Sequence, residues 1–188
     1  QDLRPRDILT PEAFENALRG EMALGCSTNS VLHLTAIAHE AGVPLDIDKI
    51  DELGRTTPQI CKLNPDSQVF ITDLNQVGGI PAVMKELSRK GLIHLDAQTV
   101  CGTVRDRVEA APDADGEIIR KIENPFRPDG GIAVLKGNIC PEGAVVKQGA
   151  VAPEMMQHVG PARCFDCEED ASEAILGGKI KEGDVVVI

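Results

Sequence analysis

The segment Leu24-Gly-Cys-Ser-Thr-Asn-Ser-Val31 decides how the first half of the chain is organised. It is small and polar, and it separates two stretches in which apolar residues recur at helical spacing. The first stretch begins at Thr10-Pro11-Glu12, where a hydroxyl cap is followed by a proline and a carboxylate. The second stretch runs from Val31 to Gly42, and glycine is a typical helix stop. We therefore predict a helix to about Leu24, then a polar loop, and then a second helix that begins directly after the loop.

The rest of the first half is also predicted to be mainly helical. Its helix signals are acidic caps, an opening Gly-Gly-Ile-Pro and a closing glycine. They predict a short helix through Leu53 capped by Asp46 or Asp48, another capped by Asp73, and a third from Gly78-Gly-Ile-Pro81 to Lys90, ended by Gly91.

Composition changes between about Arg105 and Gly116, where large apolar residues are few. We place the domain boundary there, which gives domains of residues 1–110 and 111–188. Short apolar runs separated by Gly, Pro, Asn and Asp predict strands in the second domain, at 117–121, 131–135, 144–147, 162–165 and 184–188. One helix, capped by Asp166 and ended by Gly177-Gly178, interrupts them. The expected fold class is α/β.

Charge and composition limit the possible functions. The formal net charge of −11 excludes nucleic acid and anionic membranes as expected partners, because both require a basic patch. No apolar stretch reaches the length of a membrane span, and the start has no signal peptide. The six cysteines are scattered along the chain, unlike a secreted disulfide framework. We expect reduced thiols and a cytoplasmic protein.

The loop from Gly25 to Ser30 is the most suggestive candidate for a binding site. Its hydroxyls, its amide and the free N–H groups of a helix start suit a carboxylate or phosphate ligand. The alternative is that Ser27, Thr28 or Asn29 only caps the helix, since these residue types are preferred caps. Cys164-x-x-Cys167 is a single pair and a weak metal or redox signal. The histidines are spread out, so spacing alone yields no complete catalytic set.

Longer motifs carry a resemblance to a known family. Ala23-Leu-Gly-Cys-Ser-Thr-Asn-Ser-Val-Leu-His-Leu34 resembles the GGSTN-x-x-LHL segment of the dihydroxy-acid and sugar-acid dehydratase family. Further matches follow in the family's order and cover essentially the whole chain: Gly78-Gly-Ile-Pro-Ala-Val-Met84, Gly131 to Lys147, Gly160-Pro-Ala-Arg163 and Gly183-Asp-Val-Val-Val-Ile188. Ser30 and Leu32-His33-Leu34 favour the branched-chain amino acid branch over the sugar-acid branch, which is the alternative. Cys26 departs from the pattern, since many members have glycine there.

The resemblance implies a lyase that dehydrates 2,3-dihydroxy-3-methyl acids to 2-keto acids in valine and isoleucine biosynthesis. It implies a 2Fe-2S cluster that polarises the departing 3-hydroxyl, a magnesium ion that holds the carboxylate and 2-hydroxyl, and a serine that removes the C2 proton. In the family, the cluster cysteines and the acidic magnesium ligands precede the segment that begins here at Gln1. The catalytic serine follows the strand that ends here at Ile188. The parent enzyme is expected to be a homo-oligomer.

This chain is therefore expected to be a carboxy-terminal piece of such an enzyme, without the missing amino-terminal region and inactive alone. It would comprise the helical end of the family's α/β domain, followed by a truncated swivelling β-barrel-like domain. We assign no catalytic or metal-binding residue and no bound cofactor to it, and in particular no cluster ligand to Cys26 or Cys61. Ser27, Thr28 and Asn29 are the predicted substrate-binding residues. A non-catalytic binding or structural module is the alternative from another class.

Overall fold

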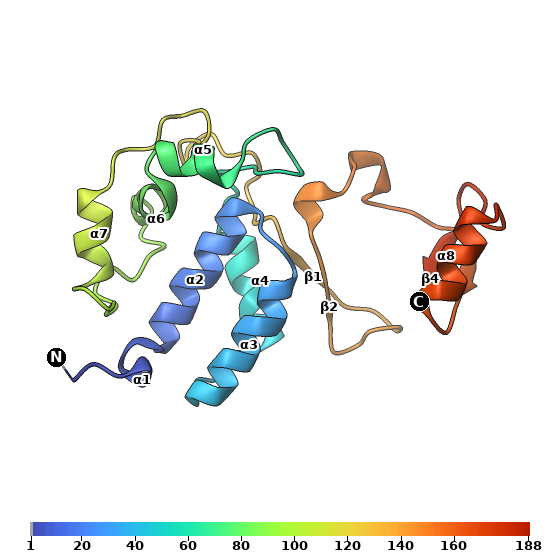
Figure 1. Cartoon of the computed structure of the whole chain (residues 1–188), viewed down its shortest axis with the longest axis horizontal. Coiled ribbons are helices and arrows are strands. Elements are labelled where there is room, and N and C mark those ends of the chain that lie inside the picture. Colours follow the sequence, from blue (N-terminus) through green and yellow to red (C-terminus); the bar gives the residue numbers. More distant parts are fainter. Residues whose placement is uncertain (1) are drawn as a thin grey trace. The chain divides into compact units, whose positions relative to one another are not determined.

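The computed structural model describes residues 2–188 and divides the chain into two compact units, Gln1–Ala150 and Val151–Ile188. The first unit contains most of the helices, and the second is a small strand–helix–strand element (Figure 1). Each unit has its own packing.

The first unit contains the helices that the capping and stop signals predict, with small shifts at their ends, and two more that those signals do not predict, the first and the last in chain order. In chain order its helices are α1 (Pro5–Ile8), α2 (Pro11–Leu24), α3 (Asn29–Ala41), α4 (Ile47–Thr56), α5 (Ile71–Gln76), α6 (Gly79–Ser88) and α7 (Val104–Ala110). The predicted helices before and after the polar loop are thus confirmed as α2 and α3. Asp46 caps α4 by accepting a hydrogen bond from the N–H of Lys49 at 2.8 Å.

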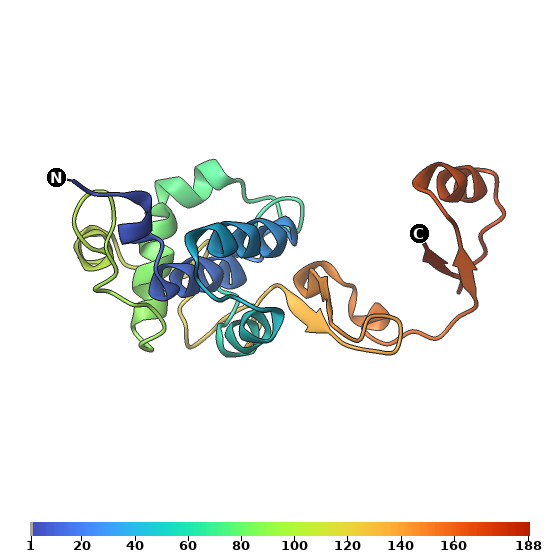
Figure 2. The same cartoon turned by 90° about the horizontal axis from the view of Figure 1, so that it is seen from below.

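Helix α2 is the centre of the first unit, and it packs against both α4 and α6 (Figure 2). Its start follows from its sequence, because Thr10 Oγ1 accepts a hydrogen bond from the N–H of Ala13 at 3.3 Å and Pro11 holds the first helical position. Its end follows from Gly25, which adopts the left-handed conformation with φ of 65°. The helix therefore stops where the polar loop begins.

Two clusters of buried apolar side chains share α2. On one side, Ala23 and Leu24 join a cluster built from α5, α6 and the segments that follow α4 and α7. On the other side, Leu18 and Met22 join Ile50 and Leu53 of α4. Burying aliphatic side chains stabilises the fold by roughly 1.5–3 kcal/mol for each large residue. Because aromatic residues are few, aliphatic packing holds α2 between the two clusters.

Residues 111–150 belong to the first unit and pack on its helices. Ile119 and Ile122 are fully buried in the first cluster, and Ile132 is buried in the second. Strands β1 (Ala133–Leu135) and β2 (Ala144–Val146) form an antiparallel pair in which Ala133 is opposite Val146, and the short helical turn η1 (Gln148–Ala150) follows. The division by contacts thus falls at Ala150, whereas the domain boundary near residue 110 stays a prediction.

Several local predictions were wrong. Residues 117–121 form no strand, and residues 117–119 are bends, because the Asp115 carboxylate accepts backbone hydrogen bonds from Ile118 and Ile119 and turns the chain. The expected connection after Arg105 contains most of α7. Asp73 is the third residue of α5 and not its N-cap, but it does cap the helix start, because its carboxylate accepts a hydrogen bond from the N–H of the N-cap residue Phe70 at 2.8 Å. Helix α8 begins after Cys167, so Asp166 is not its cap.

The second unit is a β-α-β element. Strand β3 (Ala162–Cys164) pairs in parallel with β4 (Val185–Val187), and α8 (Glu168–Leu176) connects them; the helical turn η2 (Pro153–Met155) precedes. Ala171 and Ala174 form the buried face of α8. Arg163 Nε and Asp184 Oδ2 are 3.0 Å apart and join the two strands.

The complete swivelling barrel-like domain stays a prediction, since the described strands form two separate pairs. Within residues 2–188, no helix has the length and apolar character that a membrane crossing requires.

Candidate functional site

The polar loop between α2 and α3 is held in place at both ends. At its start, the N–H groups of Gly25 and Cys26 both donate to the Glu21 carbonyl, at 3.0 and 3.4 Å. At its end, the N–H of Ser30 donates to the Ser27 carbonyl at 3.2 Å, which begins the first turn of α3. The loop is therefore a short, ordered link with its polar side chains at the amino terminus of α3.

Ser27, Thr28 and Asn29 lie together at this helix start, as the sequence predicts. Ser27 Oγ accepts a hydrogen bond from the N–H of Asn29 at 3.2 Å, so part of the capping alternative is correct. Thr28 occupies the cap position, but its side chain makes no capping hydrogen bond. Among the described residues, neither the Thr28 hydroxyl nor the side-chain amide of Asn29 has a hydrogen-bond partner, and Asn29 is exposed. These two side chains are free to bind a polar ligand.

Glu21 lies beside this loop and was missed by the sequence analysis. Its side chain is 7% exposed and accepts a hydrogen bond from Ser30 Oγ, the first hydroxyl of α3. Burial raises the pKa of the Glu21 carboxyl above its usual value, and the hydrogen bond from Ser30 offsets this only in part. A signal was present, because Glu21 lies three residues after Leu18 and three before Leu24, on the apolar face of α2.

The cysteines near the loop are suited to packing. Burial raises the pKa of the Cys26 thiol to about 11, and the nearby carboxyl of Glu21 adds to this effect. Burial also raises the pKa of the Cys61 thiol, to about 12. Thiolates are the form that binds iron or attacks a substrate, so both residues are disfavoured for either role.

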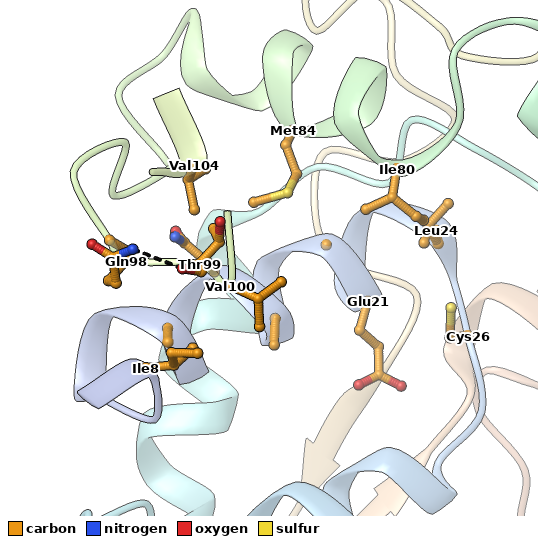
Figure 3. Close-up of a pocket in the computed structure, with 15 residues that line it drawn as sticks. Ile8, Glu21, Leu24, Cys26, Ile80, Met84, Gln98, Thr99, Val100 and Val104 are labelled. Atoms are coloured by element: carbon orange, nitrogen blue, oxygen red, sulfur yellow. Dashed lines mark hydrogen bonds between the residues drawn. The ribbon is translucent and has the colours of Figure 1, made fainter. Parts of the chain in front are cut away.

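A mostly apolar cavity of about 460 Å³ lies along α2, between α6 and the loop of residues 97–104 (Figure 3). Leu24, Ile80 and Met84 line the cavity, and Val100, which belongs to the loop of residues 97–104, also lines it. Glu21 and Cys26 lie at the end nearest the polar loop, and among the described residues that line the cavity only Glu21 carries an ionisable carboxyl. The loop Ser27–Asn29 and the cavity are thus linked through Glu21.

No metal centre is formed by the residues that the structure describes. Within residues 2–188, no group of three or more His, Cys, Asp or Glu side chains is arranged to hold a metal ion. Cys164 is exposed at the end of β3 and Cys167 lies at the start of α8, in the second unit. His94 pairs with Glu15 across a distance of 2.8 Å, away from the loop.

Comparison with known proteins identifies the family. The profile described as "Dihydroxy-acid/6-phosphogluconate dehydratase N-terminal" matches residues 1–107, and the corresponding C-terminal profile matches residues 117–188. Together these matches cover nearly all of the chain. The chain belongs to the dihydroxy-acid/6-phosphogluconate dehydratase family, which confirms the resemblance seen in its motifs.

Relatives within this family are similar over the whole chain. The dihydroxy-acid dehydratase of Acetivibrio thermocellus is 60% identical over 189 residues. Those of Lachnoclostridium phytofermentans and Aquifex aeolicus are 57% and 54% identical. Each alignment covers 100% of this chain but 34% of the relative. The chain therefore spans about a third of the length of the curated relatives it matches.

Proposed function

We propose that this chain is part of a dihydroxy-acid dehydratase, a hydro-lyase that converts 2,3-dihydroxy-3-methyl acids to 2-keto acids in branched-chain amino acid biosynthesis. The observation that carries the proposal is the identity of 54–60% to proteins of that name, sustained from one end of the chain to the other. The complete protein is proposed to be a cytoplasmic homo-oligomer.

Within that enzyme, the proposed role of the Ser27–Asn29 loop is to contact the substrate. A dihydroxy acid presents a carboxylate and two hydroxyl groups, and such groups bind best to N–H and hydroxyl donors at a helix start. The Thr28 hydroxyl and the Asn29 amide provide such donors, and no described residue competes for them. The positive end of the α3 dipole also favours an anion. This arrangement supports substrate binding by the loop without a catalytic step of its own.

The 2Fe-2S cluster and magnesium ion that the family implies have no fitting ligand set among residues 2–188. Cys26 and Cys61 are close to the loop, but their raised thiol pKa values disfavour the thiolate that a cluster needs. We therefore propose that both groups bind to other parts of the complete enzyme. The chain described here supplies a substrate-contacting loop and the fold that supports it.

This division of roles is tested by an anaerobic assay for 2-keto acid from 2,3-dihydroxyisovalerate. The 188-residue chain, after attempted iron–sulfur reconstitution, is compared with the complete dehydratase that contains it. Turnover by the complete enzyme alone is the expected result. Turnover by the 188 residues would contradict the division, and inactivity of both on this substrate but turnover of a sugar acid by the complete enzyme would favour the sugar-acid branch.

The loop is tested in the complete enzyme by Asn29→Ala. Losing one hydrogen bond to the substrate is expected to raise KM about fivefold. Asn124→Ala removes an exposed amide outside the loop and serves as the control, with no expected change in KM. Unchanged KM and kcat in Asn29→Ala would remove Asn29 from the proposed site.

A further inference from the structure

Two positively charged side chains share one aromatic ring in the first unit. The guanidinium carbon of Arg120 lies 3.7 Å from the centroid of the Phe126 ring, and Lys62 Nζ lies 5.3 Å from the same centroid. Both distances are within the range of cation–π attraction, which extends to about 6 Å. Lys62 is far from the other two residues in the sequence, so the fold brings this basic–aromatic cluster together.

Backbone hydrogen bonds hold the basic–aromatic cluster in place. The N–H of Arg120 donates to the Ile60 carbonyl at 2.9 Å, and the N–H of Phe126 donates to the Gln59 carbonyl at 2.8 Å. Gln59 and Ile60 are 1% and 0% exposed, so this segment is part of the packed interior. Lys62 follows in the same segment, and it is half-buried, as are Arg120 and Phe126. The cluster therefore has a fixed base and is partly open to solvent.

Neither cation of the cluster is paired with a carboxylate in the part of the chain that the structure describes. Asp66, in the turn that follows the lysine, is paired with Lys147 instead, at 3.0 Å. Glu117 and Glu123 flank Arg120 in the sequence, but they are exposed and form an ion pair with neither cation. Two like charges beside one ring repel each other, and a bound anion relieves that repulsion. The cluster is therefore a local positive site in a chain with a net charge of −11.

The contact with the ring leaves the hydrogen-bond donors of Arg120 free. At 3.7 Å from the centroid, the guanidinium contacts the face of the Phe126 ring, and its N–H groups lie in its own plane. No described residue accepts a hydrogen bond from these N–H groups. Their planar fork matches two oxygens of one carboxylate or phosphate group. Lys62 adds a second positive charge beside the same ring, and two positive charges attract a dianion more strongly than a monoanion.

We propose that Lys62 and Arg120 bind a small oxyanion beside Phe126, and that they favour a phosphate group over a single carboxylate. Arg120 donates to two oxygens of the ligand, Lys62 neutralises its remaining charge, and the ring holds both cations. This site shares no residue with the Ser27–Asn29 loop and does not depend on the proposed function. Two cations do not suffice for a nucleic acid, because the net charge of −11 repels a polyanion.

The test on the 188-residue chain is an NMR titration with sodium phosphate, at a pH at which phosphate is mainly a dianion. The side-chain N–H of Arg120 and the backbone amides of residues 59–62 and 120–126 report binding, and sodium chloride at equal ionic strength is the blank. The expected result is a saturating shift with a dissociation constant in the millimolar range or below. Absence of a saturating shift would overturn the proposal.

Charge-changing variants show whether the two cations form the site. Arg120→Gln and Lys62→Gln are each expected to weaken phosphate binding about tenfold, since each removes a charged donor. Arg120→Lys keeps the charge but not the planar fork, so its affinity should lie between those of wild type and Arg120→Gln. Arg107→Gln is the matched control, because Arg107 is an exposed cation of α7, outside the cluster. Equal weakening in Arg107→Gln and Arg120→Gln would show that only net charge matters and would overturn the site.

Further probes define the ligand. Sodium acetate presents a single carboxylate and is expected to bind more weakly than phosphate, so equal affinity would overturn the preference for a phosphate group. A phosphate group can belong to a free ion or to a monoester, and both offer the oxygens that the Arg120 fork needs. Methyl phosphate distinguishes these sources. If it binds as tightly as inorganic phosphate or more tightly, the site is assigned to a monoester; if it binds less tightly, the site is assigned to the free ion.

The complete dehydratase tests whether the site is available in the whole enzyme. Isothermal titration calorimetry with sodium phosphate is expected to show binding there as well, with the same loss of about tenfold in Arg120→Gln. This measurement requires no turnover, so it stands apart from the assay of the proposed function. Phosphate binding that is present in the 188-residue chain but absent from the complete enzyme would show that another part of the enzyme occupies the two cations, which would overturn the ligand site.

Discussion

The side chain of Gln59 lies directly against Gly25, at the point where α2 turns into the polar loop. A Cβ atom at Gly25 would overlap Gln59 Nε2 and come within 3.1 Å of Gln59 Cδ. Gln59 is 1% exposed, and its Nε2 donates to the Cys61 carbonyl at 3.1 Å, so the amide cannot swing into solvent. Gly25 is thus needed both for its left-handed φ of 65° and for the space above Gln59. The contact between Gly25 and Gln59 therefore requires glycine at the first residue of the polar loop.

Gly25→Ala is expected to destabilise the chain by about 3 kcal/mol, from the left-handed backbone and the overlap with Gln59 together. Gly42→Ala is the matched control, because Gly42 ends α3 with φ of 75° and no described atom lies within 4 Å of the place that an added methyl group would take. It should lose only about 1 kcal/mol. Urea unfolding followed by far-UV circular dichroism measures both. Equal losses would show that Gln59 does not restrict this position.

A double-mutant cycle isolates the contact itself. Gln59→Ala removes the side chain that Gly25→Ala would strike, so the cost of Gly25→Ala should fall by about 1 kcal/mol or more in that background. The left-handed strain remains in the double variant, since it belongs to the backbone. If the stability losses of Gly25→Ala and Gln59→Ala simply add in the double variant, the contact with Gln59 is not the reason that residue 25 has to be glycine.

Helix starts and stops were readable from the sequence because they depend on neighbouring residues. Thr10 and Asp46 each cap a helix as predicted, and Gly25 and Gly42 each end one. The position of Ser27, Thr28 and Asn29 at the start of α3 follows from the same local rules. Such predictions require only a few residues of context.

Features that depend on distant contacts were not readable. Residues 117–121 have the composition of a strand, but Ile119 and Ile122 enter the first apolar cluster while Asp115 bends the backbone. Glu21 has the spacing of an apolar position, and its hydrogen bond to Ser30 appears only once α3 folds back beside α2. The side-chain oxygen Oε1 of Gln59 is buried and has no hydrogen-bond partner among the described residues. Its burial likewise depends on segments that are far apart in the chain. Tertiary packing decides these cases, and one sequence carries little signal for it.

Glu15 gives the first unit an acid-dependent element of stability. Burial alone would raise the pKa of its carboxyl, but hydrogen bonds from His94 at 2.8 Å and Lys49 at 3.1 Å outweigh it and lower the pKa below 4.5. The folded state therefore binds this proton less tightly than the unfolded state. The contribution of Glu15 to stability is present above pH 4.5 and is lost as the pH falls through its lowered pKa.

Glu15→Gln is accordingly expected to cost about 1 kcal/mol at pH 7, since its partly exposed ion pairs are each worth less than that. The difference from wild type should shrink on acidification toward pH 3. Glu40→Gln changes an exposed carboxylate of α3 that makes no ion pair with any described residue, and it should cost little at either pH. Urea midpoints across this pH range provide the measurement. A constant difference between wild type and Glu15→Gln would contradict the assignment.

The first unit also presents large apolar side chains to solvent. Leu32 is 67% exposed on α3, and Ile71 is 61% exposed at the start of α5. Such residues on several elements of one unit favour association between copies of the chain. The net charge of −11 opposes that association through repulsion, so it should be strongest at high salt.

Light scattering over a concentration series should therefore show the 188-residue chain self-associating, more strongly at high than at low salt. Replacing both apolar residues, Leu32→Glu with Ile71→Glu, should shift the chain toward monomer. That change also adds negative charge, so the control adds the same charge at adjacent exposed polar positions, His33→Glu with Thr72→Glu. If only the apolar replacements reduce association, the apolar surface drives it. If both pairs of substitutions reduce association equally, charge repulsion alone explains the effect. A wild-type chain that is strictly monomeric at every concentration would rule out self-association through Leu32 and Ile71.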